Sequence, residues 1–105
     1  LALLENQSQE IEIQRENFLF NQNFIEIQQR NDLEKIQNLI DKDNELIELR
    51  KNIKTASLAQ LENGVINTND YLREVTAEEQ AILTKITHEI QYLLTQYNLK
   101  AQLNN

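Results

Sequence analysis

The first thirty residues place apolar side chains at intervals that suit an α-helix. One apolar series recurs every seven residues and forms a nearly straight stripe along a helix of 3.6 residues per turn. A second series falls close to the opposite side. A helix with two such stripes needs a neighbouring helix on each side, as in a closed ring or a sheet of helices. The two series are Leu4, Ile11, Phe18 and Ile25, and Ile13, Phe20, Phe24 and Ile27.

The same segment admits a second interpretation, as a pair of β-strands. Residues 11–13 place an acidic side chain between two apolar ones, as a strand does, and residues 18–20 are three bulky apolar residues that also suit a strand. Residues 21–23 could form the turn between them. Strong strand punctuation by Gly or Pro is missing, however. We therefore expect a helix here.

The middle of the chain carries residues that commonly cap helices. Asn31 and Asp32 are suited to begin a helix with Glu34 near its third position, and Asp41, Asp43 and Asn44 form a second group of this type. These signals predict that the chain reverses somewhere within residues 31–44. The expected boundaries are a helix over about 1–38, a turn within 31–44 and a helix over about 45–62.

The strongest interruption lies around Gly64, the only glycine of the chain. Glycine readily takes the left-handed conformation that closes a helix, and the polar residues 67–70 can accept the free N–H groups of the next helix. A plain helix–loop–helix corner accounts for this pattern. We predict a break over 63–69 and a helix over about 70–103. The apolar stripe of that helix contains Val75, Ile82, Ile86, Ile90, Leu93 and Tyr97, with Leu72, Leu83 and Leu94 beside it.

Composition supports elongated helices. The 105 residues contain no proline and one glycine, so they lack the punctuation of a loop-rich fold. Apolar residues make up 40% of the chain but aromatic residues only 6%, which is thin for a large globular core. The predicted fold is all-α: a long antiparallel coiled-coil helical hairpin with a helix break near Gly64, forming one segment over 1–105.

The charge and the apolar runs exclude several classes of partner. A formal net charge of −7 argues against nucleic acid, because binding to phosphates requires clustered Lys and Arg. The longest apolar run, residues 1–4, is far too short to span a bilayer. The chain has no cysteine and therefore no disulfide or thiolate chemistry. It begins without Met or a signal peptide, so we expect a segment of a longer protein.

Catalytic and metal chemistry finds little support in the sequence. Asp41, Asp43 and Glu45 have the spacing that opens a calcium loop, but Leu46 replaces its glycine. His88 is the only histidine and has no cysteine to share a metal, so a polar helix position is expected. The chain has no nucleophile–base constellation and no phosphate-binding glycine loop. We therefore expect no enzyme, cofactor or metal site.

Residues 59–72, followed by Glu78, Ala81, residues 88–91 and Tyr97, resemble the carboxy-terminal repeat of TolC-family outer-membrane efflux proteins of the Bacteroidetes type. Residues 16–21 and 43–50 are also similar to that group. The most specific part of the resemblance is the helix-break motif. It consists of Gly64, Asn67, Thr68, Asp70, Tyr71 and Leu72.

The resemblance implies a tunnel wall in a trimeric outer-membrane channel. Its long helices would lie in the periplasm, and the tips of its hairpins would meet a periplasmic adaptor that links the channel to an inner-membrane pump. The channel would be a passive conduit for efflux. The implied tip and adaptor contact are Asn38, Leu39, Ile40, Asp41, Lys42, Asp43 and Asn44, of which Asp41 and Asp43 would line the entrance.

The chain departs from the TolC pattern, since it has no membrane strand and its implied tip has no glycine. One alternative is therefore a stand-alone structural coiled coil, or an adaptor-type hairpin that mediates protein–protein assembly. A second alternative is an enzyme or metal-binding helical bundle. Across these alternatives, the residues expected to pack against other helices are Ile11, Phe18, Ile25, Ile13, Phe20, Phe24, Ile27, Ile82, Ile86, Ile90 and Leu93.

Overall fold

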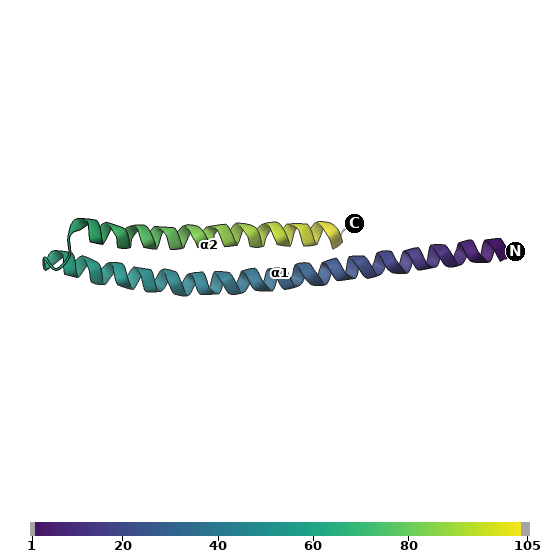
Figure 1. Ribbon diagram of the computed structural model, residues 1–105, viewed down its shortest axis with the longest axis horizontal. Helices are drawn as coiled ribbons and strands as arrows, with labels where there is room; N and C mark the ends of the chain where they lie inside the picture. Colours follow the sequence, from purple (N-terminus) through teal and green to yellow (C-terminus); the bar gives the residue numbers. More distant parts are fainter. Residues whose placement is uncertain (1, 104–105) are drawn as a thin grey trace.

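The chain folds into two long antiparallel helices in a computed structural model that describes residues 2–103 (Figure 1). Helix α1 spans Ala2–Glu62 and helix α2 spans Thr68–Leu103. The molecule measures 93 × 17 × 15 Å. A helix of 61 residues is about 92 Å long at its usual rise, so α1 alone sets the length of the molecule. The prediction of an all-α helical hairpin is confirmed.

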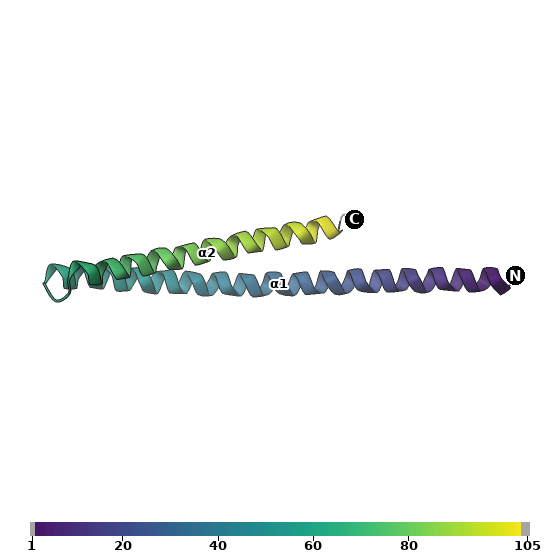
Figure 2. The same cartoon turned by 45° about the horizontal axis from the view of Figure 1, so that its top comes forward.

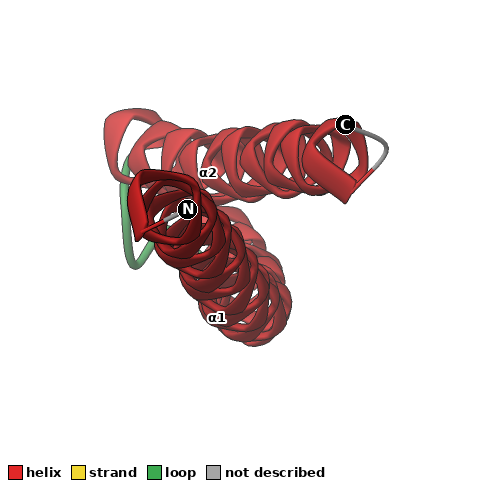
Figure 3. Cartoon of the chain, turned by 90° about the vertical axis from the view of Figure 1, so that its right-hand side faces the viewer, coloured by secondary structure: helices red, strands yellow, loops and turns green. Residues whose placement is uncertain are grey.

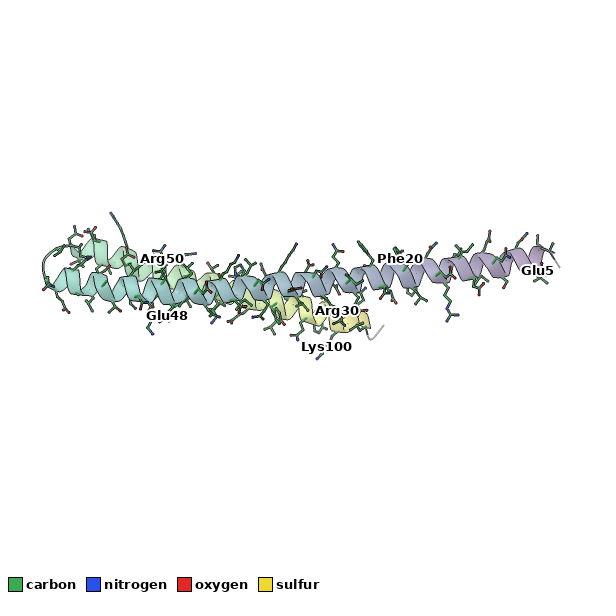
Figure 4. All side chains as sticks on the ribbon, turned by 90° about the horizontal axis from the view of Figure 1, so that it is seen from below. Glu5, Phe20, Arg30, Glu48, Arg50 and Lys100 are labelled. Atoms are coloured by element: carbon green, nitrogen blue, oxygen red, sulfur yellow. The ribbon has the colours of Figure 1, made fainter. Side chains whose placement is uncertain are left out.

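The two helices differ in length, and α1 therefore extends past the end of α2. The helices lie side by side from the turn to the end of α2, and only α1 continues beyond that point (Figures 1 and 2). Antiparallel pairing in register with a contact between Asp43 and His88 places Leu103 opposite residue 28. We call residues 2–27 the overhang. Figure 4 shows Phe20 and Glu5 on the overhang, whereas Lys100 lies near the end of α2.

The helix expected for the first thirty residues is confirmed, and the strand interpretation of residues 11–13 and 18–20 is wrong, since both segments belong to α1. Leu1, where the predicted helix begins, lies outside the described residues. The turn predicted within 31–44 is also wrong, because α1 runs through this window without a break. The residues assigned to the tip therefore lie along the side of the rod. They are Asn38, Leu39, Ile40, Asp41, Lys42, Asp43 and Asn44.

Two of the cap-type residues of this window, Asp41 and Asp43, use their side chains in other interactions and do not end the helix. Asp41 accepts a hydrogen bond from Gln37 one turn earlier, and Asp43 contacts His88 on α2. Leu33, Ile36 and Ile40 lie on the α2 side of the same segment. With no glycine or proline to interrupt the backbone, this contact with α2 keeps the segment helical.

The reversal of the chain occurs at the predicted break around Gly64. The N–H of Val65 donates to the carbonyl of Gln60 at 2.8 Å, and the N–H of Gly64 donates to that of Leu61 at 3.1 Å. This pair of bonds is a Schellman motif, which satisfies the last carbonyls of a helix. It requires a left-handed residue, and Gly64 supplies it with a φ of 73°. The short connection is the green loop of Figure 3.

Helix α2 begins with a reciprocal cap. Asn67 Oδ1 accepts the N–H of Asp70 at 2.9 Å, and Asp70 Oδ2 accepts the N–H of Asn67 at 3.3 Å. This is a capping box, which satisfies two N–H groups that the helix itself leaves free. Ile66 and Tyr71, at the two positions of a hydrophobic staple, are both half-buried. Residues 59–71 thus hold all the chemistry needed for a tight reversal.

The two helices meet along a heptad seam. On both helices most of the buried and half-buried residues are spaced by alternating intervals of three and four, which is the pattern of a coiled coil. We call these positions the seam. On α1 they are Gln29, Leu33, Ile36, Ile40, Asp43, Ile47, Arg50, Lys54, Ser57 and Leu61. On α2 they are Tyr71, Glu74, Glu78, Ala81, Lys85, His88, Tyr92, Thr95, Leu99 and Gln102.

Candidate functional site

The seam is unusual in being largely polar. Among the described residues, the only buried hydrophobic residues are Ala81 and Leu99, while Asp43 and Ser57 are buried polar residues. No large side chain of the described part is fully buried. In an ordinary coiled coil the seam positions are apolar, because burial of apolar surface drives pairing. Contact between the two helices of this hairpin therefore gives less hydrophobic stabilisation than an ordinary coiled-coil seam would.

Asp43 and His88 form the polar contact at the middle of the seam. The His88 Nδ1–H donates to Asp43 Oδ2, and the two side chains retain only 20% and 10% of their exposure. From the sequence we expect a polar helix position for His88 and a hairpin-tip position for Asp43. Neither prediction placed Asp43 and His88 in contact with each other. The signal was present, since both residues fall on heptad seam positions, but the turn placed within 31–44 separated Asp43 from α2.

Two ion pairs follow the same seam toward the Gly64 turn. Lys54 Nζ lies 2.8 Å from Glu78 Oε2, and Arg50 Nη1 lies 3.9 Å from Glu74 Oε2. The first distance is that of a close ion pair, and the second is too long for a hydrogen bond. Hydrogen bonding to the Glu78 carboxylate raises the pKa of Lys54 above its ordinary value of 10.5. Here α1 supplies the bases and α2 the acids, so this part of the seam favours one antiparallel register.

The apolar stripe of α2 faces away from α1. On a helix of 3.6 residues per turn, its centre lies about 150° from the centre of the α2 seam. Ile82 is the least exposed member at 37%, and Tyr97 the most exposed at 70%. We call this set the α2 outer stripe. It consists of Leu72, Ile82, Leu83, Ile86, Ile90, Leu93, Leu94 and Tyr97.

The overhang has exposed apolar residues on two sides. The series Leu4, Ile11, Phe18 and Ile25, which we call overhang stripe A, is interrupted by Asp32 and resumes in the same heptad position at Leu39, Leu46 and Ile53 beside the seam. The second series, overhang stripe B, contains Ile13, Phe20, Phe24 and Ile27. All eight residues of the two overhang stripes are exposed.

Overhang stripe B stops where the contact with α2 begins. Seven, fourteen and twenty-one residues beyond Ile27, the equivalent positions are Glu34, Asp41 and Glu48. Figure 4 shows Glu48 on the part of α1 that lies alongside α2 and Phe20 on the part beyond it. This face of α1 is therefore apolar in the overhang, where it suits contact with another helix. It becomes acidic beside α2, where it suits exposure to water.

The grooves between the helices are open surface hollows. One of about 250 Å³ is lined by Leu46, Arg50, Ala77, Gln80, Ala81 and Thr84. Another of about 320 Å³ is lined by Gln37, Ile40, Glu89, Tyr92 and Leu93. Small-molecule sites are usually concave and bury most of the ligand surface. Grooves along a helix pair are better suited to the side chains of a further helix.

The acidic spacing of Asp41, Asp43 and Glu45 does not form a calcium loop. These residues belong to a continuous helix, where positions two apart point about 200° away from each other. Asp43 accordingly lies in the seam, while Asp41 is exposed. Residues 2–103 contain no group of three or more His, Cys, Asp or Glu side chains placed to hold a metal ion.

Neither α1 nor α2 has a stretch, within its described residues, that is long and apolar enough to cross a membrane.

The residues predicted to pack against other helices do not form the contact between α1 and α2. Ile82, Ile86, Ile90 and Leu93 belong to the α2 outer stripe, and the remaining predicted residues belong to the overhang stripes. Apolar periodicity found the strongest stripes of the chain, and these are its exposed stripes. The seam itself was missed because Glu, Lys, His and Gln side chains occupy many of its positions.

Comparison with protein-family models, with curated proteins and with solved structures found no match to this chain. The resemblance to TolC-family proteins thus stays a prediction that rests on the residues of the sequence.

Proposed function

We propose that this chain is a non-catalytic assembly element, a helical hairpin that packs its outer apolar stripes against neighbouring helices. The observation that carries the proposal is the distribution of side chains across the two helices. Polar and charged residues occupy more than half of the seam positions, and large apolar residues of α2 and of the overhang are exposed in stripes. Single exposed apolar residues are normal, but aligned stripes of this length mark interaction surfaces.

Burial of these stripes supplies a driving force that the hairpin alone lacks. Full burial of a Leu, Ile or Phe side chain contributes about 1.5 to 3 kcal/mol. The overhang stripes and the α2 outer stripe together contain fifteen Leu, Ile or Phe residues and one tyrosine, each at least 37% exposed. Packing even half of them against a partner would add substantially to the hydrophobic burial of the seam, whose buried hydrophobic residues are Ala81 and Leu99 in the described part.

The polar seam has a complementary role in this proposal. Buried polar and charged contacts add little net stability, but they disfavour wrong registers, in which a charge would lose its partner. Asp43 with His88, and Lys54 with Glu78, fix how α2 lies on α1. The hairpin thereby presents its outer stripes in a defined arrangement to the helices that cover them.

Photo-crosslinking in the native protein tests this function. A photoreactive amino acid in place of Phe20 or Ile90 should give abundant adducts with helical segments, because both side chains would be covered by a partner. The control is the same amino acid at Asn52, which is exposed on the polar face of α1 and should give few adducts. Absence of adducts from both stripe positions would reject the proposed function.

A second candidate function is the tunnel wall of a TolC-like outer-membrane efflux channel in the periplasm. The observation that favours it is the overhang, whose stripes A and B would suit a helix placed between two neighbours in a closed ring. The parent protein would then be a trimer that conducts substrates passively, joined through an adaptor to an inner-membrane pump. Because residues 38–44 lie along the side of the rod, the end that reaches the adaptor would be the Gly64 turn.

Two observations separate this candidate from a stand-alone coiled coil. The gene of a channel should encode amphipathic membrane strands next to this segment, and the gene of a stand-alone hairpin should not. In the full-length protein, photoreactive residues at Asn63 and Val65 should capture the adaptor if the turn is the docking end. Capture from neither position, together with the absence of flanking strands, would reject the channel candidate.

A further inference from the structure

We propose that the α2 outer stripe pairs with the same stripe of a second copy of this chain. The two α2 helices would run antiparallel, with Ile86 of each copy opposite Ile90 of the other. This inference rests on the proposed function, since it names the partner of one of the outer stripes. The stripe and the seam lie about 150° apart on α2, so α1 does not obstruct the second copy.

The spacing of the stripe is the same in both directions. Leu83, Ile86, Ile90 and Leu93 follow one another at intervals of three, four and three residues. A two-fold axis between Ile86 and Ile90 therefore places Leu83 opposite Leu93 of the second copy and Ile86 opposite Ile90. Two-fold interfaces require a surface that is complementary to itself, and this stripe meets that requirement with aliphatic residues in every central layer.

The charges beside the stripe are compatible with self-pairing. In the proposed register Thr87 lies near its own counterpart on one side of the axis, and Glu89 does so on the other side. Each Glu89 has a base of its own, because Lys85 Nζ lies 3.6 Å from Glu89 Oε1. Toward the ends, Tyr97 lies opposite Glu79, and Lys100 lies opposite Thr76. The two Glu89 side chains are thus the only charges of the same sign that the central layers bring together, and each of them is offset by Lys85 of its own chain.

The overhang is a poorer surface for self-pairing. It carries five acidic residues and a single base, Arg15, and antiparallel pairing with itself would bring acids against acids. Such like-charge contacts disfavour association. The acidic residues of the overhang are Glu5, Glu10, Glu12, Glu16 and Glu26. Among the apolar stripes, the α2 outer stripe is therefore the one that a second copy fits best.

The available area is close to that of a small stable interface. A standard interface buries about 800 Å² per partner, of which about 450 to 520 Å² is apolar. The eight residues of the α2 outer stripe are about half exposed, and burial of the remainder would remove roughly 400 Å² of apolar surface per copy. We accordingly expect a dimer that forms in the micromolar range of concentration.

Sedimentation equilibrium of the full chain tests the dimer. At about 100 µM the wild-type chain should sediment as a dimer. The variant Ile86→Glu/Ile90→Glu should sediment as a monomer with unchanged helical circular dichroism, because both side chains are exposed in the single hairpin. The matched control is Leu49→Glu, which changes a similarly exposed residue of α1 and should remain dimeric. A monomeric wild-type chain, or a dimer unaffected by the double substitution, would overturn the proposal.

Disulfide crosslinking tests the direction of pairing, and the absence of native cysteine makes it clean. A mixture of the Leu83→Cys and Leu93→Cys chains should form the mixed disulfide. Leu83→Cys alone should form almost none, because antiparallel pairing keeps two copies of residue 83 apart. Asn52→Cys on the polar face of α1 reports random collisions. Efficient self-crosslinking of Leu83→Cys would overturn the antiparallel arrangement.

Failure of this inference is distinguishable from failure of the proposed function. If the isolated chain is monomeric while Phe20 and Ile90 give photo-adducts in the native protein, the stripes bind other helices and only the self-pairing is wrong. If those positions give no adducts, the proposed function is rejected whatever the isolated chain does.

Discussion

Asp43 and His88 are 45 residues apart in the sequence, yet they form a part-buried polar contact between the two helices. The carboxylate accepts from the imidazole at the middle of the seam, where neither group has much access to water. The hairpin is thus joined at its centre by a polar pair in place of an apolar layer.

Loss of one member of this pair should cost more than loss of both. We expect His88→Leu to destabilise the hairpin by about 1 to 3 kcal/mol, because the Asp43 carboxylate stays buried without its partner. The double variant Asp43→Leu/His88→Leu should recover wild-type stability or exceed it, because two apolar side chains then fill the same layer. Urea unfolding followed by circular dichroism measures both. A double variant as unstable as the single one would contradict this account.

The Lys54–Glu78 ion pair should make stability fall at high pH. Because the pKa of Lys54 is raised in the folded hairpin, its contribution is fully present below 10.5 and is lost as pH rises through the higher folded-state value. The difference in thermal midpoint between wild type and Lys54→Met should therefore shrink above pH 10.5. Lys51→Met, at an exposed position one turn away, should show no such change. A difference that stays constant into the alkaline range would argue against the ion pair.

The cost of replacing Gly64 should come from its backbone conformation and not from steric contacts of the added side chain. An added Cβ at Gly64 would meet no atom within 4 Å, so steric contact contributes nothing to the cost of substitution. The φ of 73° is nevertheless unfavourable for Ala, and we expect Gly64→Ala to lose about 1 to 2 kcal/mol. Gly64→Asn should lose less, since Asn tolerates the left-handed region. Equal stability of all three chains would show that the left-handed turn is not needed.

The capping box should determine how firmly α2 begins. Asn67→Ala removes the acceptor for the Asp70 N–H and should cost about 1 kcal/mol. Amide hydrogen exchange should then speed up over the first turn of α2. Asn69→Ala, two positions later, removes no observed hydrogen bond of the cap and serves as the control. Slow exchange in the Asn67→Ala chain would mean that other contacts start the helix.

The overhang should exchange its amide hydrogens faster than the rest of α1 in a single hairpin. It has no α2 beside it, and long helices in water derive most of their stability from packing. Residues 38–44, by contrast, should be protected, because they lie within the paired part of the helix. Rapid exchange at 38–44 would favour the turn that the sequence alone suggested. Slowing of exchange in the overhang on assembly would identify it as a covered surface.

Local chemistry made the Gly64 turn predictable, whereas long-range pairing did not become visible in the sequence. The left-handed Gly64 ends one helix, and the capping residues Asn67 and Asp70 begin the next within a few residues. The cap-type residues at 41–44 look similar, but contact with α2 and the unbroken backbone override them. A seam built from charged pairs is also hidden from a search for apolar periodicity.

Because α1 is unbroken, the number of its residues determines both the length of the molecule and the direction of the overhang stripes. Each residue adds about 1.5 Å and turns the following side chains by about 100°. Insertion of seven residues near Asn31 would lengthen the rod by about 10 Å and leave the overhang stripes almost in line with Leu39 and Leu46. Insertion of a single residue would barely change the length but would swing those stripes to another side, away from the helices that they are shaped to meet.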